Sequence, residues 1–337
     1  MSSKLQKDAP VLIVGGGPVG MTMALCLAKR GIASYLVEMR TADALPDVKC
    51  NHIASRSMEL FRSLGISQDL RAAGLPDDYP HDVSYRTSTL GEEIARIHIP
   101  GRSTRLTDHS GPDGNWPTPE PPHRLNQRYI EPILRRHVQK QALITCLHRH
   151  QVMAFSQDEQ GVTAHIQNLE LPDTPALTLN VAYMVGCDGG RSMVRKGIGA
   201  KLVGDEVVQR VQSTCIRARH LKALMKAPPA WAMFTVNPKR SGNIYAIDGK
   251  EVWLIHNYLR DHEADFESVD RDWAIRTILG VGDDFEYEVM SKEDWFGRRL
   301  VSDKLQQGRV FVAGDAAHLW VPYAGYGMNA GLADAAN

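Results

Sequence analysis

Several features that mark common protein classes are absent from this sequence of 337 residues. No apolar run approaches the roughly 18 residues that span a bilayer, and Val11–Val14 is too short for the apolar part of a secretory signal. The 39 basic and 39 acidic side chains cancel, so no excess of positive charge points to a nucleic-acid partner. The five cysteines form no CxxC pair, which argues against a zinc ribbon and against a disulfide framework. We therefore expect a cytoplasmic protein without a membrane span and without nucleic acid.

What is present is an ordinary globular composition, with 43% hydrophobic and 23% charged residues. Single hydrophobic cores stop growing near roughly 250–300 residues, so a chain of this length predicts two domains. The start of the chain favours strand, helix and strand at Val11–Val14, Met21–Lys29 and Ala33–Val37. Because Val11–Val14 is short and fully apolar, it is typical of a strand buried in a parallel sheet.

The character of the sequence changes near residue 80. We expect strands at 83–88, 93–99, 152–155, 162–166, 177–185 and 309–312, and helices at 55–64, 126–140, 270–279 and from about residue 326. A long loop rich in glycine and proline is expected from Gly101 to Pro122, and Asp248-Gly249 predicts a hairpin within a strand-rich region. An α/β domain interrupted by an antiparallel β layer fits this order.

The first motif lies directly after a strand and opens a helix, and it reads GxGxxG: Gly15, Gly16, Gly17, Pro18, Val19, Gly20. The first glycine allows a tight turn, the second lets a pyrophosphate approach the backbone, and the third lets helix and strand pack closely. Glu38 ends the second strand, where a carboxylate accepts hydrogen bonds from a ribose and repels a 2′-phosphate. The motif therefore predicts FAD or NAD, and it does not choose between them.

Two later motifs place acidic side chains after strands. Asp188-Gly189 opens a short helix, although that dipeptide alone is typical of an ordinary turn. Asp315 follows the strand at 309–312, and a carboxylate at the end of a buried parallel strand points into the crevice where ligands bind. The glycine-rich segment from Gly325 to Asn329 then starts a helix whose free backbone N–H groups suit the electron-rich edge of a flavin.

In this order and at these separations, the three motifs resemble those of the class A flavoprotein monooxygenases, the aromatic hydroxylases of the phenol and para-hydroxybenzoate hydroxylase type. The resemblance runs from about residue 10 to the last residue. It implies non-covalent FAD, with NAD(P)H and O2 as co-substrates. It also implies hydroxylation of a phenolic or other electron-rich aromatic substrate through a C4a-hydroperoxyflavin.

The family's fold is implied as well: a Rossmann-like parallel-sheet FAD-binding domain with an inserted antiparallel β-sheet substrate domain. The FAD-binding domain would be discontinuous and comprise 1–79, 120–199 and 300–337, and the substrate domain would comprise 80–119 and 200–299. Relatives continue the helix in which residue 337 falls, so the chain is expected to be an N-terminal fragment.

The resemblance also assigns cofactor-binding residues. The ADP half of FAD would be held by the first motif and its acidic partner: Gly15, Gly17, Pro18, Val19, Gly20 and Glu38. The flavin and its ribityl chain would be held by Arg56, Gln127 and Asp315, and the NAD(P)H region would be served by Asp188. The isoalloxazine would be lined by Pro322, Gly325, Gly327, Met328 and Asn329.

Simpler interpretations remain open for single side chains. Arg56 has the alternative of a solvated charge on a helix, and Gln127 that of a polar residue on a helical first turn. His52, Tyr245 and His256 are weak candidates for a base or hydrogen-bond network near the substrate. The pair His148 and His150 would share one strand face, but no third ligand accompanies them, so we predict no metal site.

Rival functions are an NAD-dependent dehydrogenase, another flavin enzyme such as a halogenase, and a truncated or decayed FAD-binding protein without turnover. The contexts of Asp188 and Asp315 argue against the dehydrogenase, and the W-x-W spacing of the halogenases is absent. The sequence does not identify the ring substrate, the position hydroxylated, or the choice between NADH and NADPH. A homo-oligomer is possible on this reading, and its size is not indicated.

Overall fold

The computed structural model describes residues 10–49, 51–321 and 325–337, and its strands form two large sheets and one small sheet. The first large sheet has six strands in the order β16-β17-β9-β1-β2-β5. They are β1 (Val11–Val14), β2 (Ser34–Glu38), β5 (Ile144–His148), β9 (Tyr183–Gly186), β16 (Gln306–Gln307) and β17 (Val310–Val312). All neighbours pair in parallel except β16 and β17, which form an antiparallel edge.

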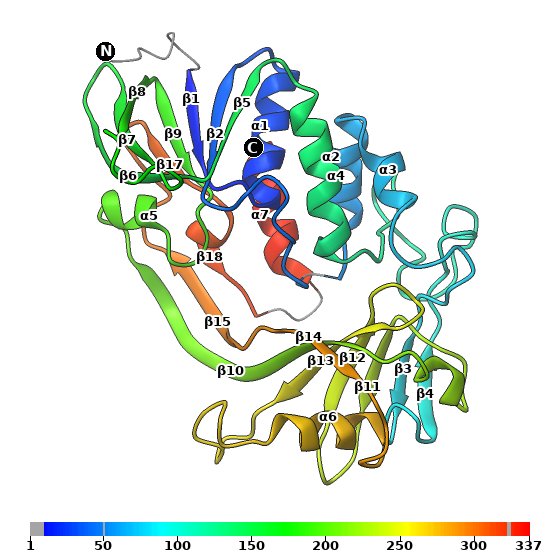
Figure 1. The fold of residues 1–337 in the computed structure, drawn as a ribbon. Helices are drawn as coiled ribbons and strands as arrows, with labels where there is room; N and C mark the ends of the chain where they lie inside the picture. The colour runs from blue at the N-terminus through cyan, green and yellow to red at the C-terminus, as the bar shows by residue number, and fades with distance from the viewer. Residues whose placement is uncertain (1–9, 50, 322–324) are drawn as a thin grey trace.

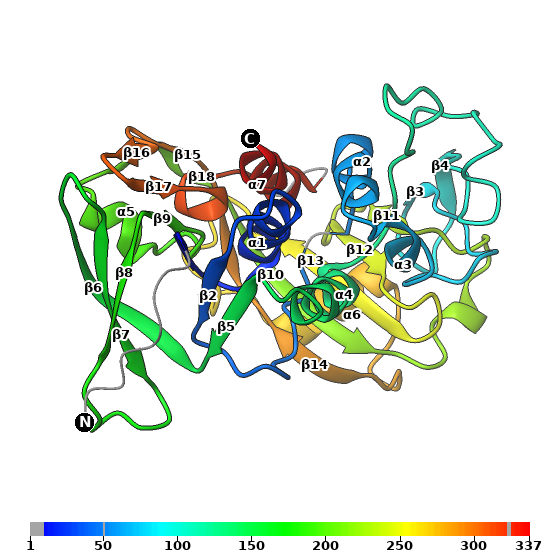
Figure 2. The same cartoon turned by 90° about the horizontal axis from the view of Figure 1, so that it is seen from above.

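Helices cover one face of this sheet (Figure 1). They are α1 (Pro18–Lys29), α2 (Ser55–Ser63), α3 (Ser67–Arg71), α4 (Gln127–Gln139) and α7 (Tyr326–Ala336). Ile13 and Leu36 of the sheet pack against Ala24 of α1 and Leu134 of α4 in one apolar core. Seen from above, α1 lies between α7 and α4 (Figure 2). The glycine-rich start of α1 therefore lies between the later motif at α7 and the start of α4.

A small antiparallel sheet covers the other face. It consists of β6 (His150–Gln157), β7 (Val162–Asn168) and β8 (Leu177–Val181), with the short helix α5 (Met193–Gly197) beside it. Leu12 and Val14 of β1 pack there against Val162 and Ile166 of β7. Because both faces of β1 are buried, its four residues are all apolar, as expected for a central parallel strand.

The second large sheet has nine strands in the order β18-β15-β10-β13-β12-β11-β3-β4, with β14 also paired to β10. Its strands are β3 (Val83–Arg86), β4 (Glu93–Ile97), β10 (Leu202–Arg217), β11 (Ala232–Thr235), β12 (Gly242–Ala246), β13 (Val252–Tyr258), β14 (Glu288–Lys292), β15 (Trp295–Ser302) and β18 (His318–Leu319). The long strands β10 and β15 run between the two parts of the molecule (Figure 1). Two short 3-10 helices, η1 (Lys222–Leu224) and η2 (Gly314–Ala316), also occur in the described part of the chain.

The two faces of the second sheet have different partners. Trp253 and Ile255 of β13 pack against Ile278 of α6 (Arg271–Leu279) in a core of their own. Leu254, between them in sequence, points to the opposite face and packs with Val48, which lies in the segment after β2. The face of the second sheet turned away from α6 therefore meets the part of the chain that carries the glycine-rich motif.

The predicted fold class is confirmed, with one difference in the second sheet. Its strands pair antiparallel except β3, which pairs in parallel with β11. The strand expected at 177–185 is two strands in two sheets, because Leu177–Val181 pairs with β7 whereas Tyr183–Gly186 pairs with β1. Leu177–Val181 alternates apolar with polar residues, and Tyr183–Gly186 does not, but this change of pattern alone does not fix the residue at which the chain changes sheet. The partition into domains stays a proposal, and β15 runs across the boundary predicted at residue 300.

Three other expectations can be compared with the structure. The segment 101–122 contains no helix or strand, as predicted. Helix α1 begins at Pro18, three residues before the predicted start at Met21, and proline suits the first helical turn. His148 and His150 do not share a strand face, because Arg149 between them has φ 57° and separates β5 from β6. Within the described residues, no helix is long and apolar enough to cross a membrane.

Candidate cofactor and substrate site

The glycines of the first motif are required for two different reasons. A Cβ atom on Gly15 would lie 2.3 Å from the carbonyl oxygen of Cys187, and one on Gly20 would lie 1.9 Å from that of Gly15. Both positions therefore hold glycine because strand, turn and helix pack closely. A Cβ on Gly17 meets nothing within 4 Å, so the backbone there is open on one side. An open second glycine is what the approach of a pyrophosphate needs.

The start of α1 is prepared for an anion. Gly17 is the N-cap residue, no side chain caps the helix, and no acidic residue lies in its first turn. The first N–H groups of the helix are thus available to phosphate oxygens, and the helix dipole favours negative charge there. Pro18 begins the helix, and Val19 packs against Gly314 and Gly331, where added Cβ atoms would lie 3.0 and 2.5 Å from its Cγ2. Val19 therefore holds the third motif against the first.

Glu38 stands beside the glycine turn at the end of β2. Its carboxylate accepts hydrogen bonds from the backbone N–H of Gly16 at 2.8 Å and of Arg40 at 2.9 Å. Burial acts to raise the pKa of Glu38, but hydrogen bonds and charge from Arg40 lower it below its ordinary value. The side chain is ionised at neutral pH, which suits ribose hydroxyls and disfavours a 2′-phosphate.

A chain of charges links Glu38 to Gln127, and the sequence interpretation missed its middle members. The guanidinium of Arg40 lies 3.2 Å from Glu131, a carboxylate buried in α4. Gln127 donates through Nε2 to Oε1 of the same Glu131 at 2.6 Å. The fixed arrangement orients both predicted cofactor ligands, Glu38 and Gln127, through one buried carboxylate. The sequence signal for Glu131 was weak, because a lone acidic residue in an amphipathic helix is typical of a solvated position.

The second motif is held by its own aspartate. Asp188 accepts hydrogen bonds from the hydroxyl of Ser192 and from the backbone N–H of Met193 and Val194, so its carboxylate fixes the turn that opens α5. The buried Arg195 donates to the carbonyl oxygens of Gly190 at 2.9 Å and Ala316 at 3.0 Å, which ties this turn to the third motif. A direct contact of Asp188 with a nucleotide stays a prediction.

Asp315 lies in η2, directly after β17. Its side chain is exposed, and it makes no hydrogen bond within the described part of the chain. Burial nevertheless raises the pKa of the Asp315 carboxyl, against the lowering effect of Lys49 and His318. An exposed carboxylate without a hydrogen-bond partner in the described residues suits contact with a polyol chain. The neighbouring turn is fixed by Asp334, which accepts from Gly314 N–H at 2.8 Å and contacts His318 Nε2 at 2.7 Å.

Lys49 lies beside residues that are predicted to bind the ribityl chain, although the sequence analysis predicted no role for Lys49 itself. Its carbonyl oxygen accepts from the backbone N–H of Gln127 at 3.1 Å, and from Nδ2 of Asn126 at 3.2 Å. Its ammonium group lies 2.8 Å from Asp47 and 3.8 Å from Glu293, which lies between β14 and β15. A single lysine in a loop carries no sequence signal for a position beside a cofactor site.

The start of α7 is open on one side and tied down on the other. Gly325 adopts φ 70° as the N-cap residue, and a Cβ on Gly327 would meet nothing within 4 Å. Asn329 donates to the carbonyl oxygens of His52 at 3.0 Å and Gly325 at 2.7 Å, and its Oδ1 accepts from Ala54 N–H at 2.8 Å. Its amide is therefore used to join α7 to the segment that leads into α2.

The remaining predicted flavin residues surround this junction. Arg56 lies exposed on the first turn of α2, next to the segment bound by Asn329. Met328 is partly buried against the helical core, so much of its side chain serves packing. Pro322 lies outside the described residues. Within the described residues, the backbone N–H groups of Gly325 and Gly327 and the guanidinium of Arg56 make no hydrogen bond, so these donors are available at one end of α7.

Aromatic side chains gather on the face of the second sheet turned away from α6. The ring centroid of His256 lies 5.4 Å from that of Tyr245 and 5.6 Å from that of Trp295. Trp231 lies 5.7 Å from Tyr245, but it packs against the core on the α6 side. Of the three weak candidates, Tyr245 and His256 are therefore adjacent. His52 lies in the segment joined to α7, where its carbonyl oxygen accepts from Asn329.

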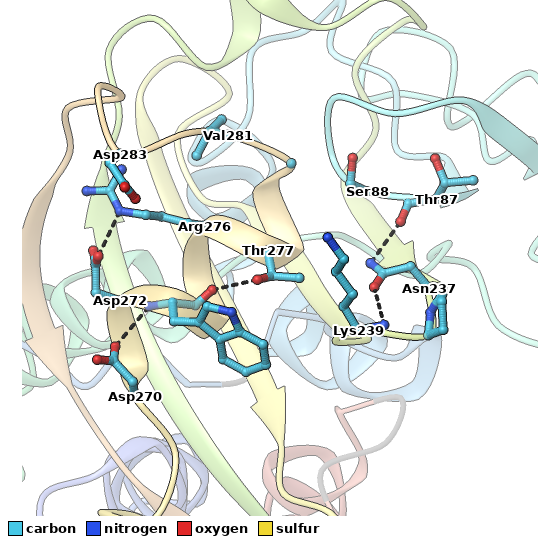
Figure 3. A pocket seen from close by; sticks show the side chains of 13 residues that line it. Thr87, Ser88, Asn237, Lys239, Asp270, Asp272, Arg276, Thr277, Val281 and Asp283 are labelled. Atoms are coloured by element: carbon cyan, nitrogen blue, oxygen red, sulfur yellow. Dashed lines mark hydrogen bonds and ion pairs between the residues drawn. The ribbon is translucent and has the colours of Figure 1, made fainter.

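A pocket of about 570 Å³ lies elsewhere, beside α6 (Figure 3). Its walls include Trp273 and Thr277 of α6 and Lys239 of the turn between β11 and β12. None of the predicted cofactor residues lines it. Being on the α6 side of the second sheet, it does not belong to the site at the glycine motif. In the described ranges, no group of three or more His, Cys, Asp or Glu side chains is arranged to hold a metal ion.

The turn, helix start and acidic partner define a dinucleotide-binding fold of the Rossmann type. The chain belongs to the FAD binding domain family, which matches residues 8–337. The cofactor is therefore FAD, and the choice that the first motif left open is settled.

Curated relatives and solved structures agree with this assignment. The chain is 28% identical over 353 residues to "FAD-dependent monooxygenase apdD" of Emericella nidulans, covering 99% of this chain and 55% of that protein. It is 27% identical to "Phenol 2-monooxygenase" of a Pseudomonas species, covering 98% of this chain and 52% of that protein. The substrate-free rebeccamycin biosynthetic enzyme RebC has a TM-score of 0.85 at 31% identity, covering 97% of this chain and 61% of that one. The chain thus spans between half and two thirds of the length of these relatives.

Proposed function

We propose that the protein containing this chain is a monooxygenase that uses FAD, NAD(P)H and O2 to hydroxylate a phenolic or other electron-rich aromatic ring. The observation that carries the proposal is the aromatic face of the second sheet, which is turned toward the part of the chain that holds the FAD motifs. FAD, when bound, would supply the redox chemistry between reduced nicotinamide and dioxygen.

The chain's own residues bind and orient the cofactor. The N–H groups at the start of α1 hold the pyrophosphate, and Glu38 accepts from the ribose hydroxyls. Gln127 and Asp315 hold the ribityl chain, with Lys49 between them providing a counter-charge. Arg56 and the backbone of Gly325 and Gly327 donate to the flavin edge, where negative charge accumulates on reduction.

The second sheet provides the other half of the site. Tyr245 and Trp295 present ring faces and edges to a flat apolar substrate and exclude water from it. Relatives named "4-methyl-5-nitrocatechol 5-monooxygenase", "Phenol 2-monooxygenase" and "Putative polyketide hydroxylase" support an aromatic substrate for this chain as well.

The test is the oxidation of NADH and NADPH by the FAD-loaded protein, with and without a panel of phenols and hydroxylated polycyclic aromatics in ¹⁸O-labelled oxygen. We expect slow oxidation alone, faster oxidation with a fitting aromatic, and a product that carries one labelled oxygen atom. If no aromatic stimulates oxidation and no product is labelled, the protein binds FAD without this turnover.

Finer statements belong to the same proposal. We infer a cytoplasmic protein from the cysteine usage and a possible homo-oligomer, the latter to be measured by light scattering. The division into an FAD-binding and a substrate domain would be tested by limited proteolysis, with cleavage expected in the loop from Gly101 to Pro122.

A further inference from the structure

His256 lies at the centre of the aromatic face. It alternates along β13 with Trp253 and Ile255, which point into the core against α6, so its ring points to the opposite side. Its cross-strand neighbours there are Asn243 of β12 and Ser213 of β10. The imidazole is thus placed on the same face as the apolar contact with Val48.

The imidazole is enclosed by rings from three strands. Its centroid lies 5.4 Å from Tyr245 on β12, 5.6 Å from Trp295 on β15 and 6.4 Å from Tyr258 on β13. The interplanar angles of 62°, 81° and 89° make all three contacts edge-to-face. Such edge-to-face contacts fix the plane of the imidazole through packing. They do not use the two ring nitrogens as hydrogen-bond donors or acceptors.

His256 keeps both ring nitrogens available. Within the described residues, neither nitrogen makes a hydrogen bond to another protein group, although the ring is largely enclosed. Burial lowers the pKa of His256 to about 4, so the ring is neutral at physiological pH and offers one donor and one acceptor. Burial also raises the pKa of Tyr245, the phenol that touches it. This surface therefore disfavours charge of either sign.

We propose that His256 is a specificity-determining residue, which hydrogen-bonds a hydroxyl or carbonyl group on a fused planar aromatic substrate that is bound uncharged. The inference rests on the proposed function and deepens it. The row from Tyr245 through His256 to Trp295 is longer than a single benzene ring, so a fused ring system fills it better. A neutral imidazole that is difficult to protonate acts as a hydrogen-bond partner, not as the acceptor of a full proton. A phenol held beside Tyr245 experiences the same burial and keeps its proton.

The test is equilibrium binding of a matched pair, 1-naphthol and 1-methylnaphthalene, to the oxidised FAD-loaded protein without NAD(P)H. The two ligands have the same shape and differ in one hydroxyl. We expect the wild type to prefer 1-naphthol by about tenfold or more, because a site that hydrogen-bonds a hydroxyl rejects the analogue lacking it. His256→Phe should lose this preference and still bind the methyl compound, and His256→Asn should restore part of it.

Tyr258→Phe, on the same face, serves as the matched control and should keep the preference for the hydroxyl. An unchanged preference in His256→Phe overturns the proposal, as does a wild type that binds neither ligand. If His256→Phe fails to retain FAD, the preference for 1-naphthol over 1-methylnaphthalene is compared between the wild type and His256→Asn instead. A preference reduced in His256→Asn supports the proposal, and an unchanged one overturns it.

Ionisation of the ligand is followed with 4-nitrophenol at a pH where the free compound is half ionised. We expect phenolate absorbance to decrease on binding, and an increase would overturn the uncharged mode. Both experiments use the oxidised protein, so they are independent of turnover. A retained naphthol preference without labelled product would contradict only the proposed function.

Discussion

Gly17 and Gly20 belong to one motif, but the structure gives their missing side chains different consequences. A Cβ on Gly20 would collide with the backbone of Gly15, whereas a Cβ on Gly17 would enter open space. Gly17 also has φ −73°, a value that alanine adopts without strain. The constraint at Gly20 therefore comes from the packing of the protein itself. The constraint at Gly17 comes only from a ligand that approaches the backbone from outside.

Gly17→Ala and Gly20→Ala should therefore separate folding from FAD binding. We expect Gly17→Ala to leave the stability of the apo-protein within about 0.5 kcal/mol and to weaken FAD binding at least tenfold, because the methyl group occupies the approach of the pyrophosphate. Gly20→Ala should destabilise the apo-protein by roughly 1–3 kcal/mol through overpacking. Urea unfolding of the apo-proteins and titration with FAD measure both. Equal FAD affinity in Gly17→Ala and wild type would show that no phosphate lies there.

Asp315 gives a second prediction at the scale of one residue. Since its carboxylate makes no hydrogen bond within the described chain, Asp315→Ala should leave apo-protein stability nearly unchanged. Loss of a charge-assisted hydrogen bond to the ribityl chain should weaken FAD binding by about ten- to hundredfold. Asp315→Asn, which keeps an oxygen acceptor, should lose less. The exposed Asp78 provides the control, and if Asp78→Ala weakened FAD binding as much, the assignment of Asp315 would fail.

Helix α7 depends on one side chain for its place beside α2. Asn329 makes three hydrogen bonds to backbone groups of His52, Ala54 and Gly325. Removing them in Asn329→Ala should destabilise the apo-protein by roughly 1–3 kcal/mol and raise the FAD dissociation rate, since the free N–H groups of α7 lose their position. Asn329→Asp keeps the acceptor for Ala54 and should be intermediate. Stopped-flow displacement of FAD gives the rate, and an unchanged rate in Asn329→Ala would argue that α7 does not contact the flavin.

The junction of α3 with the segment before α4 contains two buried histidines. His123 contacts the carbonyl oxygen of Leu70 at 3.1 Å, and its ring lies 6.2 Å from that of His81. Burial, with nearby arginine charge, lowers the pKa of His123 to about 3, and burial lowers that of His81 as well. Unfolding raises both pKa values to about 6.5, so the unfolded chain binds protons that the folded chain does not.

Stability should therefore be complete above about pH 6.5 and fall as the pH decreases toward 3. Between pH 7 and pH 5 we expect a loss of roughly 2 kcal/mol from His123, and a further loss in the same direction from His81. His123→Gln keeps a donor for Leu70 and should remove its share of this pH dependence. Urea midpoints at the two pH values measure the effect, with the exposed His165→Gln as control. A pH profile of His123→Gln equal to that of the wild type would contradict the neutral buried state.

Elements with local signals were predictable from the sequence, and those decided by distant partners were not. The strand at Val11–Val14 and the glycine turn after it follow from a short apolar run and three glycines. The break at Ala182 depends on which sheet each half joins, and this information lies in β1 and β7. The separation of His148 from His150 depends on one residue with positive φ that is not glycine. No composition rule predicts such a residue.

At the scale of the molecule, the site combines parts that no single stretch of sequence reveals. The glycine motif, Glu38 and Asp315 were predicted because strand ends and glycine spacing carry them. The aromatic face was not, because Tyr245, His256 and Trp295 meet only through the register of β12, β13 and β15. The link from Arg40 to Glu131 joins residues that are far apart in the chain and was missed for the same reason.

The two large sheets should unfold as one unit and respond to FAD together. Strand β10 pairs with β15 near one end of the molecule and with β13 near the other, and Val48 packs against Leu254 across the two parts. FAD at one hundred times its dissociation constant adds about 2.7 kcal/mol to the free energy of unfolding. If the parts are coupled, calorimetry should show a single transition that moves upward with FAD, with equal calorimetric and van't Hoff enthalpies. The second sheet would then be stabilised by a ligand whose main contacts are on the first.

Val48→Ala should reduce this coupling more than Val203→Ala, an exposed change on β10. A second transition that does not move with FAD would show instead that the second sheet unfolds independently, so that cofactor binding does not order the aromatic face.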